Sequence, residues 1–316
     1  MRRAASNRSK ALGNGGLGFR EKLPYASALR SPCWSKHIEH KQGRETTMSI
    51  FKDNVLQGKR ALITGGGSGI CKGIADAFLA HGATVTITSR SQERLDSASA
   101  ELTQKTGSKC FGFACDVRNP EEVESVLDRA IESMGGLDIV VNGAAGNFLS
   151  PAAALSPKGF KTVMEIDAQG TYNVSHLAFH KALRENGGHI LNISATLQYA
   201  GSILQVHAGS AKAAIDAMTK HLAVEWGPLG IRVNAIAPGP IDNTVGMSKL
   251  APGGFKAKME ASIPLGRFGR IDEIADAALY LSSDAADYIT GSILVVDGGA
   301  WMTSGNIFKQ AFDSMM

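Results

Sequence analysis

Short apolar runs alternate with longer amphipathic segments along the chain from Lys59 onward. Between most of these runs lie segments of roughly 15 to 40 residues in which apolar residues recur at i, i+3 and i+4, the spacing of an α-helix. Runs that are apolar on both faces are typical of parallel strands covered by helices on each side. The predicted strands are residues 60–64, 83–89, 109–116, 137–142, 188–194, 231–237 and 292–299.

The amphipathic segments predict helices over residues 121–134, 160–183 and 271–283, among others. Neither a fixed-period repeat nor a linker divides the middle of the chain. We therefore expect a single doubly wound α/β domain with a parallel sheet of the Rossmann type, spanning about residues 50–305. Polar residues interrupt the uncharged segment 190–211, so we expect a strand, a loop and a helix start there and no membrane span.

Charge separates the first 47 residues from the rest. Residues 1–47 carry ten Lys/Arg and three Asp/Glu, which leaves 23 basic and 26 acidic residues in the remainder. The basic excess therefore belongs to this extension and does not indicate a nucleic-acid partner. Because the extension lacks apolar periodicity, we expect it to be disordered or a targeting segment, unless translation starts at Met48.

The four cysteines show neither CxxC nor metal-ligand spacing, so we expect no disulfide framework, no metal site and a reduced compartment.

A glycine-rich turn, TGGGSGIC from Thr64 to Cys71, directly follows the first predicted strand and opens a helix. Glycines let backbone N–H groups approach a pyrophosphate, and the helix N-terminus adds positive potential. In this context the turn predicts dinucleotide binding. Cys71 stands where a G-x3-G-x-G pattern ends in glycine, and we expect it to push the helix outward or to fill a small gap.

The second strand ends at Ser89 and Arg90, without the acidic residue that would hold the ribose 2′-hydroxyl of NAD. Arg90 and nearby Arg94 could instead meet a 2′-phosphate. The sequence therefore favours NADP.

These features resemble the short-chain dehydrogenase/reductase family over about residues 55–303. The resemblance rests on TGGGSGI (64–70), CDV (115–117), VNGAAG (141–146), ISA (193–195), AKAA (211–214) and APGPI (237–241). Within the family, residues 144–156, 160–175, 205–228 and 297–303 are similar to the 2,4-dienoyl-CoA reductases of peroxisomes. These enzymes use NADPH to reduce 2,4-dienoyl-CoA to 3-enoyl-CoA in the β-oxidation of unsaturated fatty acids. The resemblance implies that residues 48–316 form an NADP-binding reductase domain with a built-in acyl-CoA site.

Ordinary family members use an Asn, Ser, Tyr and Lys tetrad, and only the lysine, Lys212, is kept here. The other three positions hold Asp167, Ala195 and Ala208, and the place of the tyrosine of mitochondrial dienoyl reductases holds Leu197. Carbonyl reduction needs a phenol and a hydroxyl around a developing alkoxide. Their loss argues against a ketone substrate.

A dienoyl thioester makes a different demand. Hydride addition at C5 drives electrons toward the thioester, and the resulting dienolate is protonated at Cα, so the site must hold an oxyanion and deliver a proton to carbon. We expect Asp167 to deliver this proton, directly or through a water, and Lys212 to bind the nicotinamide ribose and lend positive charge. Tyr199, thirteen residues before Lys212, is the alternative donor.

The resemblance also assigns binding residues. Asn147 or Phe148 is expected to place the thioester or the acyl chain. The expected NADP contacts are Gly65, Gly66, Gly67, Ser68, Gly69, Ile70, Arg90, Arg94, Asp116, Lys212, Pro238, Gly239, Ile241 and Thr244. The expected acyl-CoA contacts are Arg118, Asn147, Phe148, Ser156, Pro157, Lys158 and Lys249.

Three further expectations concern partners, compartment and competing functions. We expect a homo-oligomer, a dimer or tetramer, and from the resemblance a peroxisomal location, with mitochondrion or cytosol as alternatives. Residues 30–38, RSPCWSKHI, have the R-x6-H spacing of an N-terminal peroxisomal signal, whereas the chain ends DSMM rather than SKL. A ketoacyl or sugar reductase and a catalytically silent NADP-binding protein are the competing functions.

Overall fold

Seven strands form one parallel sheet in a computed structural model that describes residues 50–244 and 255–303. Their order across the sheet is β3-β2-β1-β4-β5-β6-β7, and each predicted apolar run overlaps one strand. The strands are β1 (Arg60–Thr64), β2 (Thr84–Ser89), β3 (Cys110–Ala114), β4 (Ile139–Asn142), β5 (Gly188–Ile193), β6 (Ile231–Pro238) and β7 (Ile293–Val296). The predicted doubly wound α/β class is therefore confirmed.

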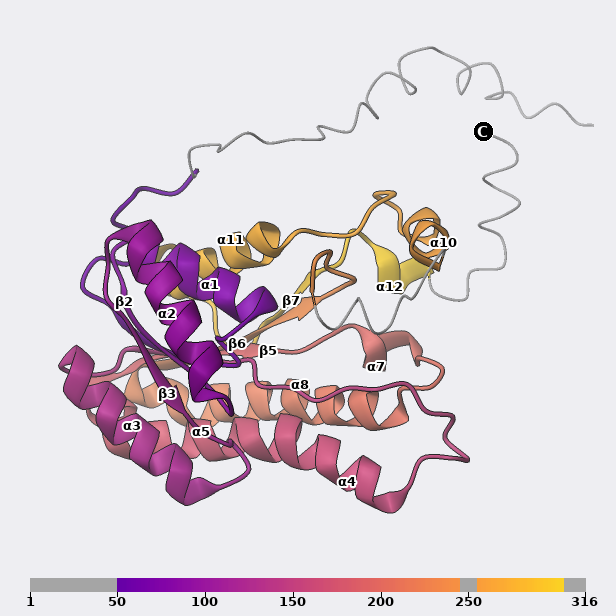
Figure 1. The fold of residues 1–316 in the computed structure, drawn as a ribbon, viewed down its shortest axis with the longest axis horizontal. Coiled ribbons are helices and arrows are strands. Elements are labelled where there is room, and N and C mark those ends of the chain that lie inside the picture. The colour runs from indigo at the N-terminus through magenta and orange to yellow at the C-terminus, as the bar shows by residue number, and fades with distance from the viewer. Residues whose placement is uncertain (1–49, 245–254, 304–316) are drawn as a thin grey trace, which may run out of the picture. The chain divides into compact units, whose positions relative to one another are not determined.

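Helices cover both faces of the sheet (Figure 1). On one face lie α1 (Gly69–Ala80), α2 (Gln92–Thr106) and α11 (Ile271–Ser282), and on the other lie α3 (Pro120–Met134), α5 (Gly170–Ala178) and α8 (Val206–Trp226). Side chains of β1 alternate between the two resulting cores. Ala61 and Ile63 belong to one buried cluster and Leu62 to the other, as the two-residue period of a strand requires.

The predicted helix over residues 160–183 contains two π-helical turns. It runs through α4 (Pro157–Met164), η3 (Glu165–Gln169), α5, η4 (Phe179–Leu183) and α6 (Arg184–Asn186), where η3 and η4 are π-helical. Single π turns are rare and are found disproportionately at functional sites. Asp167 lies in the first of them.

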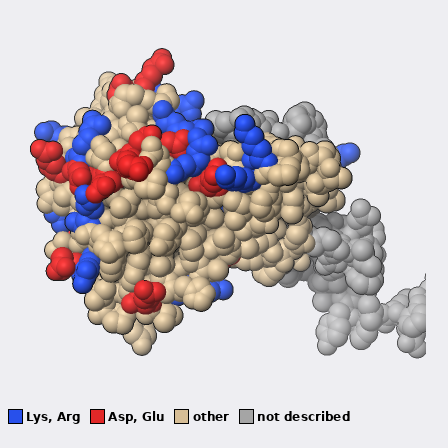
Figure 2. Space-filling view, turned by 90° about the horizontal axis from the view of Figure 1, so that it is seen from below, with Lys and Arg blue, Asp and Glu red and all other residues tan. Residues whose placement is uncertain are grey.

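Shorter elements complete the described chain. They are α7 (Leu197–Ala200), η5 (Gly227–Leu229), α10 (Phe255–Ser262), η6 (Asp284–Ala286) and α12 (Ala300–Thr303). On the face seen from below, Lys and Arg are intermixed with Asp and Glu at one end, and much of the rest is uncharged (Figure 2). Within residues 50–244 and 255–303, no helix is long and apolar enough to cross a membrane.

Strand order reverses between β1 and β4, because β2 and β3 follow β1 on one side and β4 to β7 extend on the other. In such sheets the loops after neighbouring strands diverge at the reversal and leave a crevice at the carboxyl ends of the strands. The sheet therefore places the ends of β1 and β4, with Gly65 and Gly143, at the edge of a ligand site.

Candidate active site

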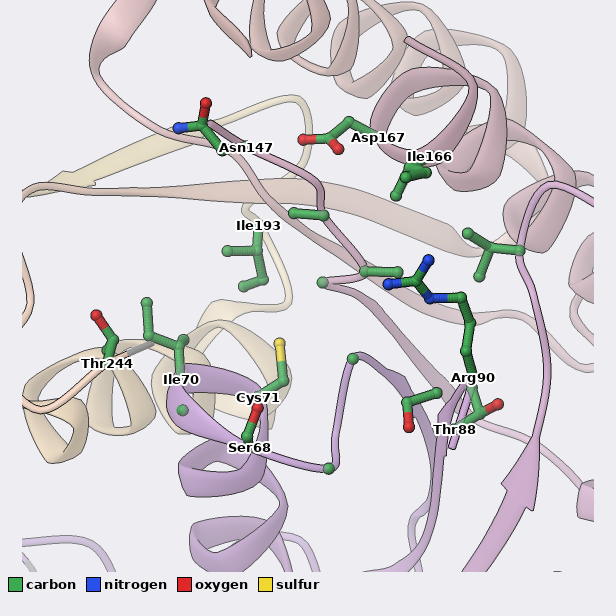
Figure 3. Close-up of a pocket in the computed structure, with 18 of the residues that line it drawn as sticks. Ser68, Ile70, Cys71, Thr88, Arg90, Asn147, Ile166, Asp167, Ile193 and Thr244 are labelled. Carbon is green, nitrogen blue, oxygen red and sulfur yellow. The ribbon is translucent and has the colours of Figure 1, made fainter. Parts of the chain in front are cut away.

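A cavity of about 700 Å³ opens at the carboxyl ends of the strands (Figure 3). Asp167 and Asn147 lie at one end of it, and Ser68, Ile70 and Cys71 lie at the other. The cavity brings together most of the residues expected from the sequence. Those that line it are Gly65, Gly67, Ser68, Gly69, Ile70, Arg90, Arg94, Asp116, Asn147, Asp167, Lys212, Pro238 and Thr244.

The glycine turn is fixed against the end of β4. Gly65 has φ +72°, and a Cβ on it would stand 2.7 Å from the carbonyl oxygen of Gly143. The hydroxyl of Thr64 accepts the N–H groups of Gly143 (2.9 Å) and Ala144 (3.1 Å). A side chain at position 65 would therefore meet both backbone strain and a clash, which is why this turn needs glycine.

Of the two alternatives for Cys71, the structure shows the second: its side chain fills a small gap. Its side chain is buried, and a Cβ built on Gly143 would lie only 2.1 Å from its Sγ. The thiol thus occupies the space that a side chain at position 143 would take. Burial raises the pKa of Cys71 to about 12, so the thiol is protonated at neutral pH.

Two of the expected cofactor glycines serve packing instead of lining the cavity. A Cβ on Gly66 would approach Ile87 Cγ2 to 2.6 Å, and one on Gly239 would approach Asp297 Cα to 2.7 Å. Ile241 is 3% exposed and forms an isolated bridge with Gly269. These three residues are therefore not part of the cavity lining.

Cations gather where the second strand ends. Arg90 and Arg94 are exposed, and Ser89 Oγ is buried without a hydrogen-bond partner among the described residues. Asp116 accepts a hydrogen bond from Arg118 Nε at 2.9 Å. This contact and the nearby charge of Arg90 hold the pKa of Asp116 below its ordinary value. Arg118 itself does not line the cavity.

The Asp167 carboxylate is buried and faces the cavity, with only 1% of the residue exposed. One oxygen, Oδ1, accepts the backbone N–H of Gly146 at 2.7 Å. The other, Oδ2, lies 3.2 Å from Lys212 Nζ and accepts no hydrogen bond from the described residues. Lys212 also donates to the carbonyl oxygen of Ile193 at 3.0 Å. A carboxylate oxygen with spare hydrogen-bonding capacity therefore stands beside a cation at the cavity wall.

Among the described residues that line the cavity, none is a tyrosine. Ala208 and Leu197 line it, at the two places where other family members are expected to carry tyrosine. Tyr199 lies outside it, with its ring edge-on to Trp301 at 5.4 Å between centroids. Burial and the nearby Asp216 raise the pKa of Tyr199 above its ordinary value, which makes its phenol a weaker acid.

Several expected acyl-CoA contacts lie together outside the cavity lining. Ser156 caps α4, accepting the N–H of Gly159 at 3.0 Å, and Pro157 and Lys158 follow it at the helix start. Phe148 packs against the same place, since its Cζ would stand 3.2 Å from a Cβ on Gly159. Lys249 lies outside the described residues.

Sequence reasoning missed the apolar and hydroxyl lining. Ile166 and Ile193 face the cavity near Asp167 and Lys212, and Ser194 joins the lining while donating to Asp216 Oδ1 at 2.5 Å. Thr88 lines it at the end of β2. The available signal was their position at or next to the carboxyl ends of strands, or beside the acidic residue of the long helix.

Comparisons with known proteins agree with this geometry. The family model for enoyl-(acyl carrier protein) reductase matches residues 65–300. A protein of Danio rerio named peroxisomal 2,4-dienoyl-CoA reductase, (3E)-enoyl-CoA-producing, is 52% identical over 81% of this chain and 86% of its own. A protein of Arabidopsis thaliana with the same name is 48% identical over 81% and 88%. The crystal structure of a short chain dehydrogenase from Bacillus anthracis is similar with TM-score 0.70 and 42% identity, covering 77% of this chain and 96% of that one.

Proposed function

Because the chain belongs to the short-chain dehydrogenase/reductase family, whose Rossmann fold binds a nicotinamide cofactor, we propose that it is a 2,4-dienoyl-CoA reductase. The proposed reaction is the NADPH-dependent reduction of 2,4-dienoyl-CoA to 3-enoyl-CoA in the β-oxidation of unsaturated fatty acids. One observation carries the proposal: a buried carboxylate, Asp167, lies beside the remaining Lys212, while the expected tyrosine position holds Ala208.

The glycine turn and the cations support NADP as the cofactor. Gly65 and Gly67 leave room for a pyrophosphate at the start of α1. Arg90 and Arg94 line the cavity where β2 ends, and no carboxylate ends that strand. A guanidinium matches the geometry of a phosphate, so these two residues suit a 2′-phosphate. When bound, the cofactor supplies the hydride.

Asp167 and Lys212 then have separate tasks. Lys212, held by the Ile193 carbonyl, would bind the ribose hydroxyls and place positive charge near the thioester oxygen. Asp167 keeps Oδ1 fixed by the Gly146 N–H, and its Oδ2 lies beside Lys212. In its protonated form, Asp167 would give the proton to Cα, directly or through a water, and would regain it from solvent. Protonation next to the thioester leaves the remaining double bond at C3, which gives the 3-enoyl product.

The acyl-CoA contacts extend from the cavity to its outer edge. Asn147 lines the cavity, and Phe148 follows it with 42% of its surface exposed. The exposed Lys158 and the Arg118 guanidinium offer cations for the phosphates of CoA. Ser156 and Pro157 complete the proposed substrate contacts.

Rapid mixing separates the candidate functions. Oxidation of NADPH is followed with 2,4-hexadienoyl-CoA and, in parallel, with acetoacetyl-CoA, and the products are separated by chromatography. We expect turnover with the dienoyl-CoA alone and a 3-enoyl product. Turnover with acetoacetyl-CoA alone would indicate a ketoacyl reductase. NADPH binding without turnover of either would indicate a silent binding protein.

We propose a peroxisomal location, since the relatives in Danio rerio and Arabidopsis thaliana are named peroxisomal. A fluorescent fusion of residues 1–47 tests the RSPCWSKHI signal, which fails if the fusion stays diffuse. The proposed homo-oligomer is supported by exposed apolar side chains on helices of one face, Tyr172 on α5 and Val224 on α8. Light scattering at several concentrations measures it.

A further inference from the structure

A fully buried histidine adjoins the position where other family members are expected to carry tyrosine. His207, at the start of α8, has no exposed surface. Its Nε2 lies 3.0 Å from the carbonyl oxygen of Phe148. A carbonyl only accepts, so Nε2 must carry the hydrogen and Nδ1 must be unprotonated in the neutral ring. Nδ1 is buried and has no hydrogen-bond partner among the described residues.

His207 also holds Phe148 through its ring. The two rings stack with centroids 4.4 Å apart and planes 27° apart. Phe148 additionally packs toward Gly159 at the start of α4, with its Cζ 3.2 Å from where a Cβ on that glycine would stand. Phe148 is therefore held at its carbonyl and its ring, while 42% of the residue stays exposed, next in sequence to Asn147 of the cavity lining.

Two residues before Phe148, the same segment contacts Asp167. The N–H of Gly146 donates to Asp167 Oδ1 at 2.7 Å. Two residues after Phe148, the N–H of Ser150 donates to the carbonyl oxygen of Leu204 at 3.0 Å. Leu204 has φ +68°, a left-handed conformation that costs free energy for a branched side chain. Residues 146–150 are thus fastened to the start of α8 on one side and to the Asp167 carboxylate on the other.

We propose that His207 is a positioning residue, which fixes residues 146–150 so that the Gly146 N–H orients the Asp167 carboxylate. The same contacts join the exposed Phe148 to the group that protonates the substrate. The catalytic consequence rests on the proposed function of Asp167, whereas the mechanical link between His207 and Gly146 does not.

Packing alone does not account for an imidazole at this place. A buried polar atom without a partner costs free energy, and Nδ1 of His207 is such an atom. An apolar ring of similar size would fill the same space without that cost but would leave the Phe148 carbonyl without its donor. The histidine is therefore explained by the hydrogen bond that it gives to the 146–150 segment.

Two substitutions separate the hydrogen bond from the ring. His207→Gln keeps an N–H near the place of Nε2 and loses the stack, whereas His207→Phe keeps the stack and loses the N–H. His221→Gln, at an exposed position of the same helix, is the matched control. Amide hydrogen exchange of Gly146 and turnover of 2,4-hexadienoyl-CoA are measured for each, together with the Kd of NADPH and deuterium incorporation at Cα in D2O.

We expect His207→Phe to speed exchange of the Gly146 amide about tenfold, the scale of one lost buried hydrogen bond. Its kcat should fall by about 10- to 100-fold, as when a catalytic group is displaced by a fraction of an ångström, and the Kd of NADPH should stay unchanged. His207→Gln should keep both within about threefold of the wild type, given that the donor is retained. The proposal would be overturned if the two variants had the same Gly146 exchange rate and the same kcat, whether both matched the wild type or both were impaired.

Failure of the proposed function leaves a distinct result. If the wild type does not turn over the dienoyl-CoA, the exchange rates alone still decide the link from His207 to Gly146. If His207→Phe does not fold, Phe148→Leu removes the ring contact but keeps the carbonyl. The Gly146 amide should stay protected in that variant, and its loss of protection would show that packing, and not the hydrogen bond, orients the segment.

Discussion

Lys212 Nζ lies 3.2 Å from Asp167 Oδ2, while the other oxygen of the same carboxylate is bound to the Gly146 N–H. The carboxylate is therefore oriented by a backbone donor and sits next to a fixed cation. Asp167 lines the cavity, where the proposed substrate carbon would be protonated. The proposed proton donor therefore differs in reach and chemistry from the phenol expected in ordinary family members.

Asp167→Ala should lower kcat for 2,4-hexadienoyl-CoA by about 10²-fold or more, the usual scale for a positioned acid. Asp167→Asn should lower it similarly, because an amide keeps the shape and one hydrogen bond but cannot release a proton. Steady-state kinetics and the Kd of NADPH measure the effect, and the Kd should change little. Glu165→Gln, in the same π-helical turn, is the control. Full activity of Asp167→Asn would direct attention to Tyr199.

Ala208→Tyr in the Asp167→Asn background should not restore turnover. A phenol at position 208 would be placed for a carbonyl oxygen, and the proton is required at Cα. Recovery of 3-enoyl-CoA formation, detected by chromatography, would contradict the assignment of the proton donor.

Arg90→Asp should weaken NADPH binding by about 1.5–3 kcal/mol, the range of a charge-assisted hydrogen bond, while NADH binding changes less. Fluorescence titration with both cofactors measures the difference. Arg184→Asp, an exposed charge reversal on α6, controls for the change in net charge. If the wild type already prefers NADH, the inference of NADP from the absence of an acidic residue at the end of β2 is wrong.

Cys71 and Gly143 should be energetically coupled. Gly143→Ala places a Cβ where the Cys71 thiol lies and should lower the free energy of unfolding by about 1–3 kcal/mol. Cys71→Ala removes the thiol and should recover about 1 kcal/mol or more of that loss in the double variant. Urea unfolding of the four proteins gives the coupling energy. Additive effects would show that the two positions do not compete for one space.

Acid should destabilise the fold through His189. Burial, with a smaller contribution from nearby Arg232, holds the pKa of this imidazole well below its ordinary value. Below about pH 6.5, His189 is therefore protonated in the unfolded chain but stays neutral in the folded chain. The free energy of unfolding falls as pH drops. The limiting slope for one such group is about 1.4 kcal/mol per pH unit. Urea unfolding between pH 7.5 and 5.0 should show a shallower slope for His189→Gln than for the wild type or His221→Gln.

A chain that begins at Met48 should keep the melting temperature and NADPH turnover of the full chain, because the predicted domain begins after the basic extension. Calorimetry and the hexadienoyl-CoA assay measure both. Loss of soluble protein on truncation would show that residues 1–47 pack against the domain.

The strands were predictable because runs apolar on both faces leave few alternatives in a parallel sheet. That the glycine turn and Arg90 lie together at the cavity was predictable from local sequence, since they belong to two consecutive strand-and-turn units. The contacts of Asp167 did not follow. They depend on the N–H of Gly146 and on Lys212, which the fold brings together from distant parts of the chain, and on a π-helical turn that apolar periodicity does not reveal. Cys71 departs from the glycine pattern in the sequence itself, but its packing partner, Gly143, becomes apparent only in the fold.

Asp167 lies in the π-helical turn Glu165–Gln169, and this makes its geometry difficult to reproduce in another protein by a single substitution. A π turn closes hydrogen bonds over one residue more than an α turn does, so residues on its two sides are related by a different rotation than in a regular helix. Writing an aspartate into the corresponding position of a relative with an unbroken α-helix would aim the carboxylate elsewhere. An engineer who wishes to move the proposed proton donor must graft the whole helical turn, because the backbone register, as well as the side chain, sets where the carboxylate points.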